Sequence, residues 1–139
     1  MTGEPVVLII SDHSNHRNIL KIQTNLTFSR REASSEIIET ETIGQAIHVL
    51  KERQIRPDLI LIAAEAVKAE GQETFERVRS NGEDTITTVI FSERKELISV
   101  SVDTGSTLFL PLPLDLELFK HLIWAKFFSA QEANQYTGM

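Results

Sequence analysis

The sequence predicts an α/β fold built around a doubly wound, parallel β-sheet. Five short apolar runs recur along the 139 residues, and an amphipathic stretch follows each of them. This alternation is typical of βαβ units, whose right-handed crossovers give the five strands the order 2-1-3-4-5. With 41% hydrophobic and 24% charged residues, the composition is that of one ordinary globular domain.

The first strand and helix are expected within residues 5–27. The apolar run over residues 5–10 predicts a strand, because it is short and rich in β-branched residues. Ser14 or Asn15 is expected to cap the helix that follows, which runs to about residue 27. The expected buried face of this helix consists of Ile19, Ile22 and Leu26.

The second strand is expected over residues 36–39, and its charged ends place it near a sheet edge. Thr42 is expected to cap the second helix, which ends before Pro57. The apolar positions of this helix are spaced three and four residues apart and predict one buried stripe: Ile43, Ala46, Ile47 and Leu50.

The third strand is expected over residues 58–63, an apolar run opened by Pro57. A third helix is expected over residues 70–80, with Phe75 and Val78 facing inward, and Asn81-Gly82 ends it. The fourth strand is expected over residues 86–91.

The last third of the chain predicts the remaining strand and two helices. The βαβ pattern requires a fourth helix over residues 93–104. However, apolar and polar residues alternate over residues 98–102, as in a strand, and the β-branched residues there are poor helix formers. We therefore expect a short or distorted helix. The fifth strand is expected over residues 107–110, and Asp115 is expected to cap a helix reaching about residue 130. The expected core stripe of that helix is Leu116, Phe119, Leu122, Ile123 and Phe127.

The complete pattern predicts a single flavodoxin-like domain over residues 1–130, with five helices, and a polar tail over residues 131–139. In such a sheet, ligands bind at the carboxyl ends of strands 1 and 3. These ends are Ser11-Asp12 and residues 63–65, so a functional site is expected there.

The composition disfavours several classes of function. There is no cysteine, which excludes disulfides, thiolate metal sites and a cysteine nucleophile. The net charge of −6 argues against nucleic-acid binding, which needs a basic surface. No apolar run approaches the roughly 20 residues of a membrane span, and the amino terminus has no signal-peptide pattern. We therefore expect a cytoplasmic protein without a membrane contact.

The run from Pro57 to Ile62 and the turn at Pro113 resemble the matching parts of bacterial receiver domains. These CheY-like domains are the phosphorylated modules of two-component response regulators, and the resemblance covers residues 5–130. It implies a phosphoacceptor aspartate at the end of the third strand, but this position is Ala63. A methyl side chain has no nucleophile, so the resemblance is to a receiver scaffold that lacks its reactive group.

Other positions of the same pocket also depart from the receiver pattern. Receivers carry an acidic pair after strand 1, and the matching pair here is Ser11-Asp12. The hydroxyl after strand 4 survives as Ser92, but Glu93 follows it where a small residue is usual. The Lys-Pro pair after strand 5, often joined by a cis peptide bond, is Leu112-Pro113. We expect Leu112 to fill space beside Ala63 and to hold the domain in one conformation.

Glu65 is the nearest carboxylate beyond the third strand. Two residues along an extended strand span about 6–7 Å, which is too far from position 63 for positioned chemistry. We therefore do not expect Glu65 to accept a phosphoryl group.

No bound metal or cofactor is expected. Asp12, Glu65 and Glu93 are the acids nearest the site, and Mg²⁺ bound through so few carboxylates usually needs a phosphate ligand as well. The four histidines form no metal set by their spacing, although two of them could approach each other on the first turn: His13, His16, His48 and His121.

A protein interface is the favoured location of function. In receivers, the face built from helix 4, strand 5 and helix 5 commonly binds a partner or a second copy. Trp124 and Phe128 extend the apolar arc of the last helix, and Phe109 lies on the fifth strand. Such aromatic residues are enriched at interfaces, although a fully covered helix would explain the same pattern.

The sequence therefore favours a phosphorylation-independent pseudo-receiver that acts as a regulatory protein-interaction module and not as an enzyme. One alternative is a small-molecule sensor that uses the vacated receiver pocket. A flavodoxin-like enzyme is disfavoured, because the turn after the first strand has no glycine-rich phosphate loop and no nucleophile–base set is apparent.

Overall fold

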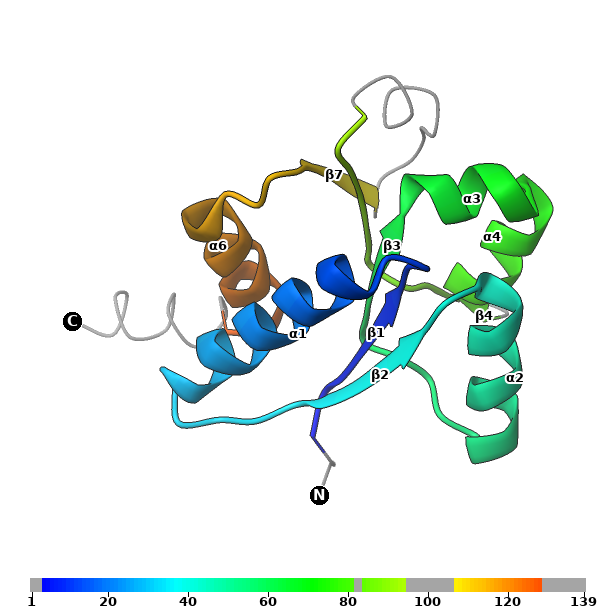
Figure 1. The fold of residues 1–139 in the computed structure, drawn as a ribbon. Helices are drawn as coiled ribbons and strands as arrows, with labels where there is room; N and C mark the ends of the chain where they lie inside the picture. Colours follow the sequence, from blue (N-terminus) through cyan, green and yellow to red (C-terminus); the bar gives the residue numbers. More distant parts are fainter. Residues whose placement is uncertain (1–3, 82–83, 95–106, 129–139) are drawn as a thin grey trace.

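The computed structural model describes residues 4–81, 84–94 and 107–128. Its main element is a sheet of five parallel strands in the order β2-β1-β3-β6-β7 (Figure 1). In chain order, these strands are β1 (Val6–Ile10), β2 (Glu36–Thr40), β3 (Leu59–Ala63), β6 (Thr88–Ser92) and β7 (Thr107–Pro111). The predicted flavodoxin-like order 2-1-3-4-5 is confirmed, and β2 lies at a sheet edge as expected.

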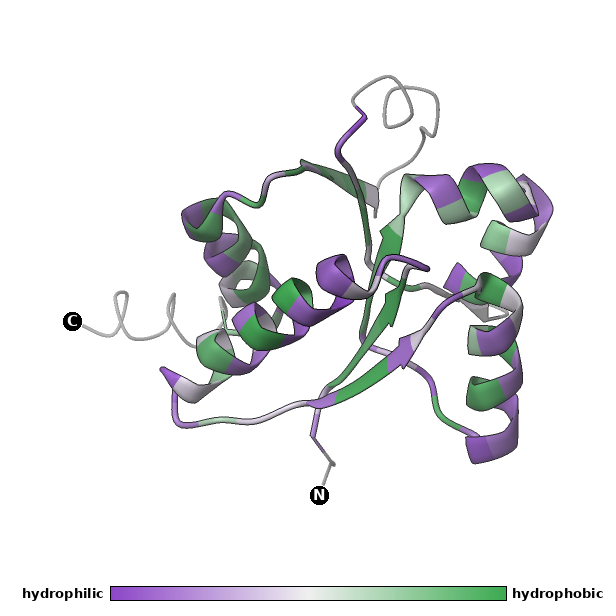
Figure 2. Cartoon of the chain, in the orientation of Figure 1, coloured by the Kyte–Doolittle hydropathy of each residue, from purple (hydrophilic) through white to green (hydrophobic). Residues whose placement is uncertain are grey.

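Helices cover both faces of the sheet. Helices α1 (Ser14–Ser29) and α6 (Leu116–Phe127) lie on one face, and α2 (Ile43–Arg53), α3 (Ala64–Glu70) and α4 (Gln72–Arg79) lie on the other (Figure 1). Successive residues of a strand point to opposite faces, so Leu8 and Ile10 join the α2 side while Val7 and Ile9 join the α1 side. Figure 2 shows the central strands as uniformly hydrophobic, as expected for a sheet covered on both faces.

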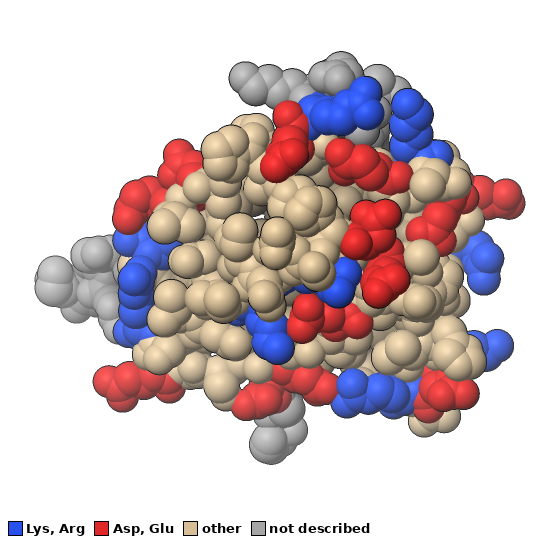
Figure 3. Space-filling model, viewed as in Figure 1, with Lys and Arg blue, Asp and Glu red and all other residues tan. Residues whose placement is uncertain are grey.

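The buried face of α1 differs from the prediction. Ile19, Ile22 and Leu26 are 47%, 52% and 44% exposed. The buried positions of this helix lie on a neighbouring stripe and include two threonines: Leu20, Thr24, Thr27 and Phe28. The Thr27 hydroxyl donates a hydrogen bond to the Gln23 carbonyl, which satisfies one buried polar group within the helix. In Figure 3 the surface over α1 is largely tan, meaning uncharged.

The caps of two helices are as predicted. Thr42 accepts a hydrogen bond from the Gln45 amide at the start of α2, and Asp115 accepts one from the Leu118 amide at the start of α6. The predicted cap of α1 is wrong, because the helix begins at Ser14 and its N-cap residue is His13, which makes no side-chain cap bond. The absence of a side-chain cap leaves the first-turn amides of α1 to other partners.

The start of α2 has a second partner, from a distant part of the chain. The Glu70 carboxylate accepts hydrogen bonds from the Ile43 amide at 2.6 Å and the Gly44 amide at 3.0 Å. A carboxylate at a helix N-terminus is favoured by both the unpaired amides and the helix dipole. This contact ties the end of α3 to the start of α2.

The third crossover contains two helices instead of the single helix predicted over residues 70–80. Helix α3 begins directly after β3, and the chain breaks at Gly71 (φ 94°) before α4 begins. Phe75 and Val78 of α4 are buried, as predicted. The pair β4 (Ser80–Asn81) and β5 (Asp84–Thr85) forms an antiparallel hairpin that was not predicted, and the fourth strand of the main sheet starts at Thr88 and not at residue 86.

Helix α6 buries Phe119 and Ile123, and Leu122 and Phe127 are half-buried against the core. Leu116, which was predicted to belong to this stripe, is 52% exposed. The helix expected within residues 93–104 and the tail over residues 131–139 fall largely or wholly outside the described residues. In the described part of the chain, no helix is both long and apolar enough to span a bilayer.

Two glycines are expected to respond to alanine substitution with opposite signs. Gly71→Ala should lower the free energy of unfolding by about 1 kcal/mol, because an L-residue is strained at this positive φ although no atom lies within 4 Å of the added Cβ. Gly44→Ala should raise it by about 0.5 kcal/mol, because Gly44 lies within α2 and its added Cβ would make only ordinary contacts. Urea unfolding of both variants measures the difference, and equal shifts would contradict this explanation.

Candidate functional site

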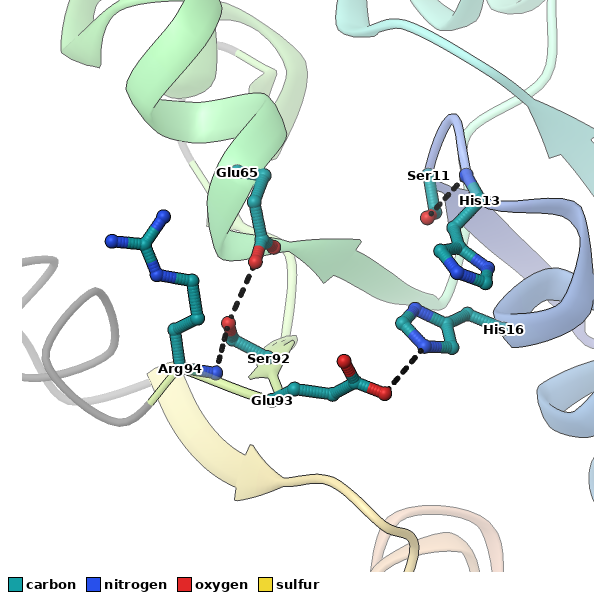
Figure 4. A network of polar contacts seen from close by, with 7 residues as sticks. All are labelled: Ser11, His13, His16, Glu65, Ser92, Glu93 and Arg94. Atoms are coloured by element: carbon teal, nitrogen blue, oxygen red, sulfur yellow. Dashed lines mark hydrogen bonds and ion pairs between the residues drawn. The ribbon is translucent and has the colours of Figure 1, made fainter.

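The carboxyl edge of the sheet brings the predicted site residues together. Ala63 ends β3 and pairs in register with Phe91. Ser92 ends β6, and Ser11 directly follows β1 (Figure 4). The Leu112 amide donates to the Ser92 carbonyl at 2.9 Å, which holds the loop after β7 against the same edge. The Leu112–Pro113 peptide bond is cis. The substituted positions of the receiver pattern therefore lie together at the carboxyl ends of the strands, in the place of the receiver pocket.

The centre of this pocket is apolar. Ala63 is 4% exposed and belongs to the core cluster on the α1 side of the sheet. Leu112 is partly buried and packs against that cluster. Ala63 carries a methyl group and Leu112 an isobutyl group, so neither side chain supplies a nucleophile or a charge.

Ser11 is held within the turn after β1. It is 1% exposed, and its hydroxyl accepts a hydrogen bond from the His13 amide at 3.1 Å. The Arg17 guanidinium donates to the Ser11 carbonyl at 2.6 Å and also lies 3.5 Å from the Glu39 carboxylate. Asp12, the surviving acid of the pair, is exposed. This turn is stabilised by a cation on α1 and does not direct a pair of acids into the pocket.

Glu65 and Ser92 form the main polar contact of the site. The Ser92 hydroxyl donates to the Glu65 carboxylate at 2.9 Å and accepts a hydrogen bond from the Arg94 amide at 2.9 Å (Figure 4). Ser92 is 1% exposed, whereas Glu65 reaches it from the surface. The extended backbone that we assumed between residues 63 and 65 is wrong, because the strand ends at Ala63 and α3 begins at Ala64. The first turn of α3 directs the carboxylate to the end of β6.

Two histidines and Glu93 form the opposite wall. His13 and His16 stack with ring centroids 3.8 Å apart, so their predicted approach is confirmed. The His16 Nε2 atom lies 3.4 Å from a Glu93 carboxylate oxygen, and the His16 ring meets Phe91 edge-on. Glu93 thereby bridges the end of β6 to α1 across the space that a small residue would leave open (Figure 4).

The donor set does not fit the Mg²⁺ ion that the receiver resemblance implies. Mg²⁺ prefers oxygen ligands in octahedral geometry. Here Ser11 replaces one acid, Ala63 replaces another, and the Glu65 and Glu93 carboxylates contact Ser92 and His16. Within residues 4–81, 84–94 and 107–128, no group of three or more histidine, aspartate or glutamate side chains is placed to hold a metal ion.

A small cavity adjoins the pocket. It has a volume of about 140 Å³ and lies between α1 and the loop after β7, where Ile19, Leu112 and Leu114 contribute to its lining. Pockets that enclose small organic ligands usually measure at least about 300 Å³. The cavity therefore does not favour the alternative of a small-molecule sensor that uses the vacated receiver pocket.

The predicted interface residues lie in two different environments. Phe109 on the edge strand β7 is 37% exposed, and its neighbour Leu108 is 42% exposed. Trp124 is half-buried, with the Arg31 guanidinium 4.5 Å and the Lys120 ammonium 4.9 Å from its ring centroid. Phe128 packs against Phe28 with ring centroids 5.5 Å apart. Phe109 is the most accessible of the three predicted anchors.

Sequence reasoning missed several contacts of the candidate site. The pairing of Glu65 with Ser92, the bridge from Glu93 to His16 and the role of Arg17 were not predicted. One sequence signal for the contact of Glu65 with Ser92 was present. Glu65 comes two residues after the end of β3, so it lies in the first turn of any helix that follows the strand directly. The bridge from Glu93 to His16 joins residues far apart in the sequence, and Arg17 contacts a backbone carbonyl, so residue spacing reveals neither contact.

Comparison with known proteins identifies the fold. No protein-family model matches the sequence, and no curated protein matches it significantly. A signal receiver domain of an HD-domain protein from Pseudomonas fluorescens is similar in structure, with a TM-score of 0.69 and 15% identity over 97% of this chain and 95% of that one. A response regulator from Thermotoga maritima has a TM-score of 0.64 and 18% identity over 89% and 98%.

A mutant of the anti-anti-sigma factor PhyR from Bartonella quintana is also similar, with a TM-score of 0.61 and 13% identity over 94% of this chain and 52% of that one. At these identities, structural similarity establishes the fold and not the activity. The chain therefore has the fold of response-regulator receiver domains.

Proposed function

We propose that the chain is a phosphorylation-independent signalling module that acts by binding a protein. The observation that carries this proposal is the Ser92–Glu65 hydrogen bond beside the methyl group of Ala63. By resemblance to receivers, the hydroxyl after strand 4 receives the charge of a newly added phosphoryl group. Here a carboxylate of the chain itself already accepts that hydrogen bond, and the position of the phosphoacceptor has no nucleophile.

The chemistry of this contact supports a fixed state. A carboxylate oxygen accepts a hydroxyl hydrogen bond as a phosphoryl oxygen would, and bonds to an ionised acceptor are among the stronger ones. The Ser92 hydroxyl is buried and has a second partner in the Arg94 amide, so turning away would leave polar groups unsatisfied. We infer that Glu65 performs permanently what phosphorylation performs reversibly in a receiver.

The proposed docking surface is the exposed part of β7 together with the start of α6. Leu108, Phe109, Leu116 and Leu118 are between 37% and 52% exposed, and all four are large apolar side chains. Edge strand β7 also offers backbone groups to a second chain. The partner is a protein or a second copy of this chain, and a cytoplasmic location in a bacterial signalling pathway belongs to the same proposal.

Replacing Phe109 tests this surface without any phosphoryl donor. Phe109→Asp should weaken self-association by at least about tenfold, because it places a charge within an apolar contact. The control is Ile22→Asp, which alters an apolar residue on α1 that is 52% exposed, compared with 37% for Phe109, and should leave association unchanged. Sedimentation equilibrium gives the dissociation constants. If the wild-type protein stays monomeric, self-association through this surface is contradicted. If Ile22→Asp weakens association and Phe109→Asp does not, the interface lies on α1 instead.

A further inference from the structure

A larger cavity lies at the amino ends of β3 and β6, whereas the receiver pocket lies at the carboxyl ends of the strands. Its volume is about 360 Å³, and it is bounded by the ends of α2 and α4 and by the residues that lead into β3 and β6. Leu50, Ile55, Val78 and Ile86 provide an apolar floor. Helices α2 and α4 lie side by side on the same face of the sheet (Figure 1). The volume is within the range of small-molecule pockets.

The polar part of the lining carries charge of one sign. Lys51, Arg56 and Arg77 line the cavity, and no aspartate or glutamate does. Within the described residues, none of these three cations forms a salt bridge. The net charge of the chain is −6, so the positive lining of this cavity contrasts with the charge of the protein as a whole.

Neighbouring cations behave differently. Arg53, also in the last turn of α2, pairs with Glu36, and Arg79 at the end of α4 lies 3.8 Å from a Glu76 carboxylate oxygen. Neither residue lines the cavity. The arginines beside the cavity are thus neutralised by acids, whereas the cations that line it keep their positive charge available.

Helix dipoles account for only part of this arrangement. Lys51 and Arg77 lie in the last turns of α2 and α4, where cations are favoured in any helix. Arg56 lies beyond the end of α2 in the connection to β3, so no helix dipole explains it. A dipole effect also does not explain why the three cations line the same cavity.

The end of α2 contributes a fourth polar group. Gln54 is the C-cap residue and has a left-handed backbone with φ 55°, a position that favours glycine. Gln54 and Ser80 both line the cavity. A glutamine at this position costs stability relative to glycine, and its side-chain amide is a hydrogen-bonding group that glycine would not offer.

We propose that this cavity binds an organic anion with an apolar body, such as a carboxylate or phosphate ester. The apolar floor buries the body, while Lys51, Arg56 and Arg77 contact the anionic head. Strand β3 has five residues, so about 15 Å separates this site from the receiver pocket at its other end. The site is therefore distinct from the pocket at Ala63, and its test does not depend on the proposed function.

Amide NMR titrations with octanoate, octyl phosphate, octylammonium and acetate test the site. Octanoate and octyl phosphate should both cause saturable shifts at the amides of Ile55, Arg56 and Val78. The affinity of both anions should fall as salt is added. Octylammonium should not bind there, because its head has the wrong sign. Acetate should bind at least about tenfold more weakly than octanoate, because it has no body to bury.

Matched variants assign the binding to the cations. Arg56→Gln should weaken octanoate binding about threefold and Lys51→Gln/Arg56→Gln about tenfold, whereas the control Arg53→Gln should have no effect. Gln54→Gly should weaken binding about twofold while leaving the protein at least as stable in urea. The proposal is overturned by equal binding of octylammonium and octanoate, by an unaltered affinity in the double variant, or by an absence of saturable shifts with either anion.

Discussion

Replacing Ala63 with aspartate is expected to lower the free energy of unfolding by about 3 kcal/mol. Ala63 is 4% exposed within an apolar cluster, and Leu112 stands where a receiver has the lysine that would pair with the new carboxylate. The substitution that restores the receiver residue should therefore damage this protein. Urea unfolding followed by circular dichroism measures the loss, and Ala63→Asn is the control for added size without charge.

A second substitution should recover part of this loss. Adding Leu112→Lys supplies the missing cation, and the two changes should couple favourably by about 1–2 kcal/mol in a double-mutant cycle. Leu112→Lys alone should destabilise the protein, because it buries an unpaired ammonium group. If Ala63→Asp cost less than about 1 kcal/mol, the pocket would be open to water, and the account of a filled pocket would be wrong.

Removing the Glu65 carboxylate is expected to cost about 1.5 kcal/mol, because Glu65→Ala leaves the buried Ser92 hydroxyl without its acceptor. Glu65→Gln keeps an acceptor oxygen and should cost only about 0.5 kcal/mol. Glu73→Ala is the matched control, since Glu73 also lies in the first turn of a helix. This substitution should remove only the stabilising interaction of a carboxylate with the helix dipole.

A double-mutant cycle of Glu65→Ala and Ser92→Ala measures the interaction free energy between these two side chains. The two changes should be strongly non-additive, because either one removes the same hydrogen bond. Additive costs would show that the contact contributes nothing to stability, and Glu65 would then have no role in fixing Ser92.

The architecture was accessible from the sequence because it depends on hydrophobic periodicity. Leu59 to Ala63 read as a buried strand without any tertiary information, and the strand order followed from alternation and handedness. The caps at Thr42 and Asp115 were equally local, since each side chain bonds an amide three residues away.

The errors arose where tertiary packing decided between local alternatives. Helix α1 has two adjacent stripes, and the one that the sheet covers contains Thr24 and Thr27, which hydropathy alone places outside. The helix expected over residues 70–80 corresponds to α4, whereas α3, which lies between β3 and Gly71, was not predicted. In the site, the absence of a carboxylate at the end of β3 could be read from Ala63, but the contact of Glu65 with Ser92 could not be predicted. It depends on where the first turn of α3 directs a side chain.

The central claim is that the pocket is already closed and does not respond to phosphorylation. Its most direct test is an amide NMR titration of the wild-type protein with Mg²⁺ and beryllofluoride, a mimic of the phosphoryl group. We predict no saturable shift at Ser11, Ser92, Glu93 or Leu112, because Ala63 offers no carboxylate for the mimic and Ser92 already donates to Glu65. Saturable shifts at these amides would contradict the claim and would show that the receiver switch still operates in this chain.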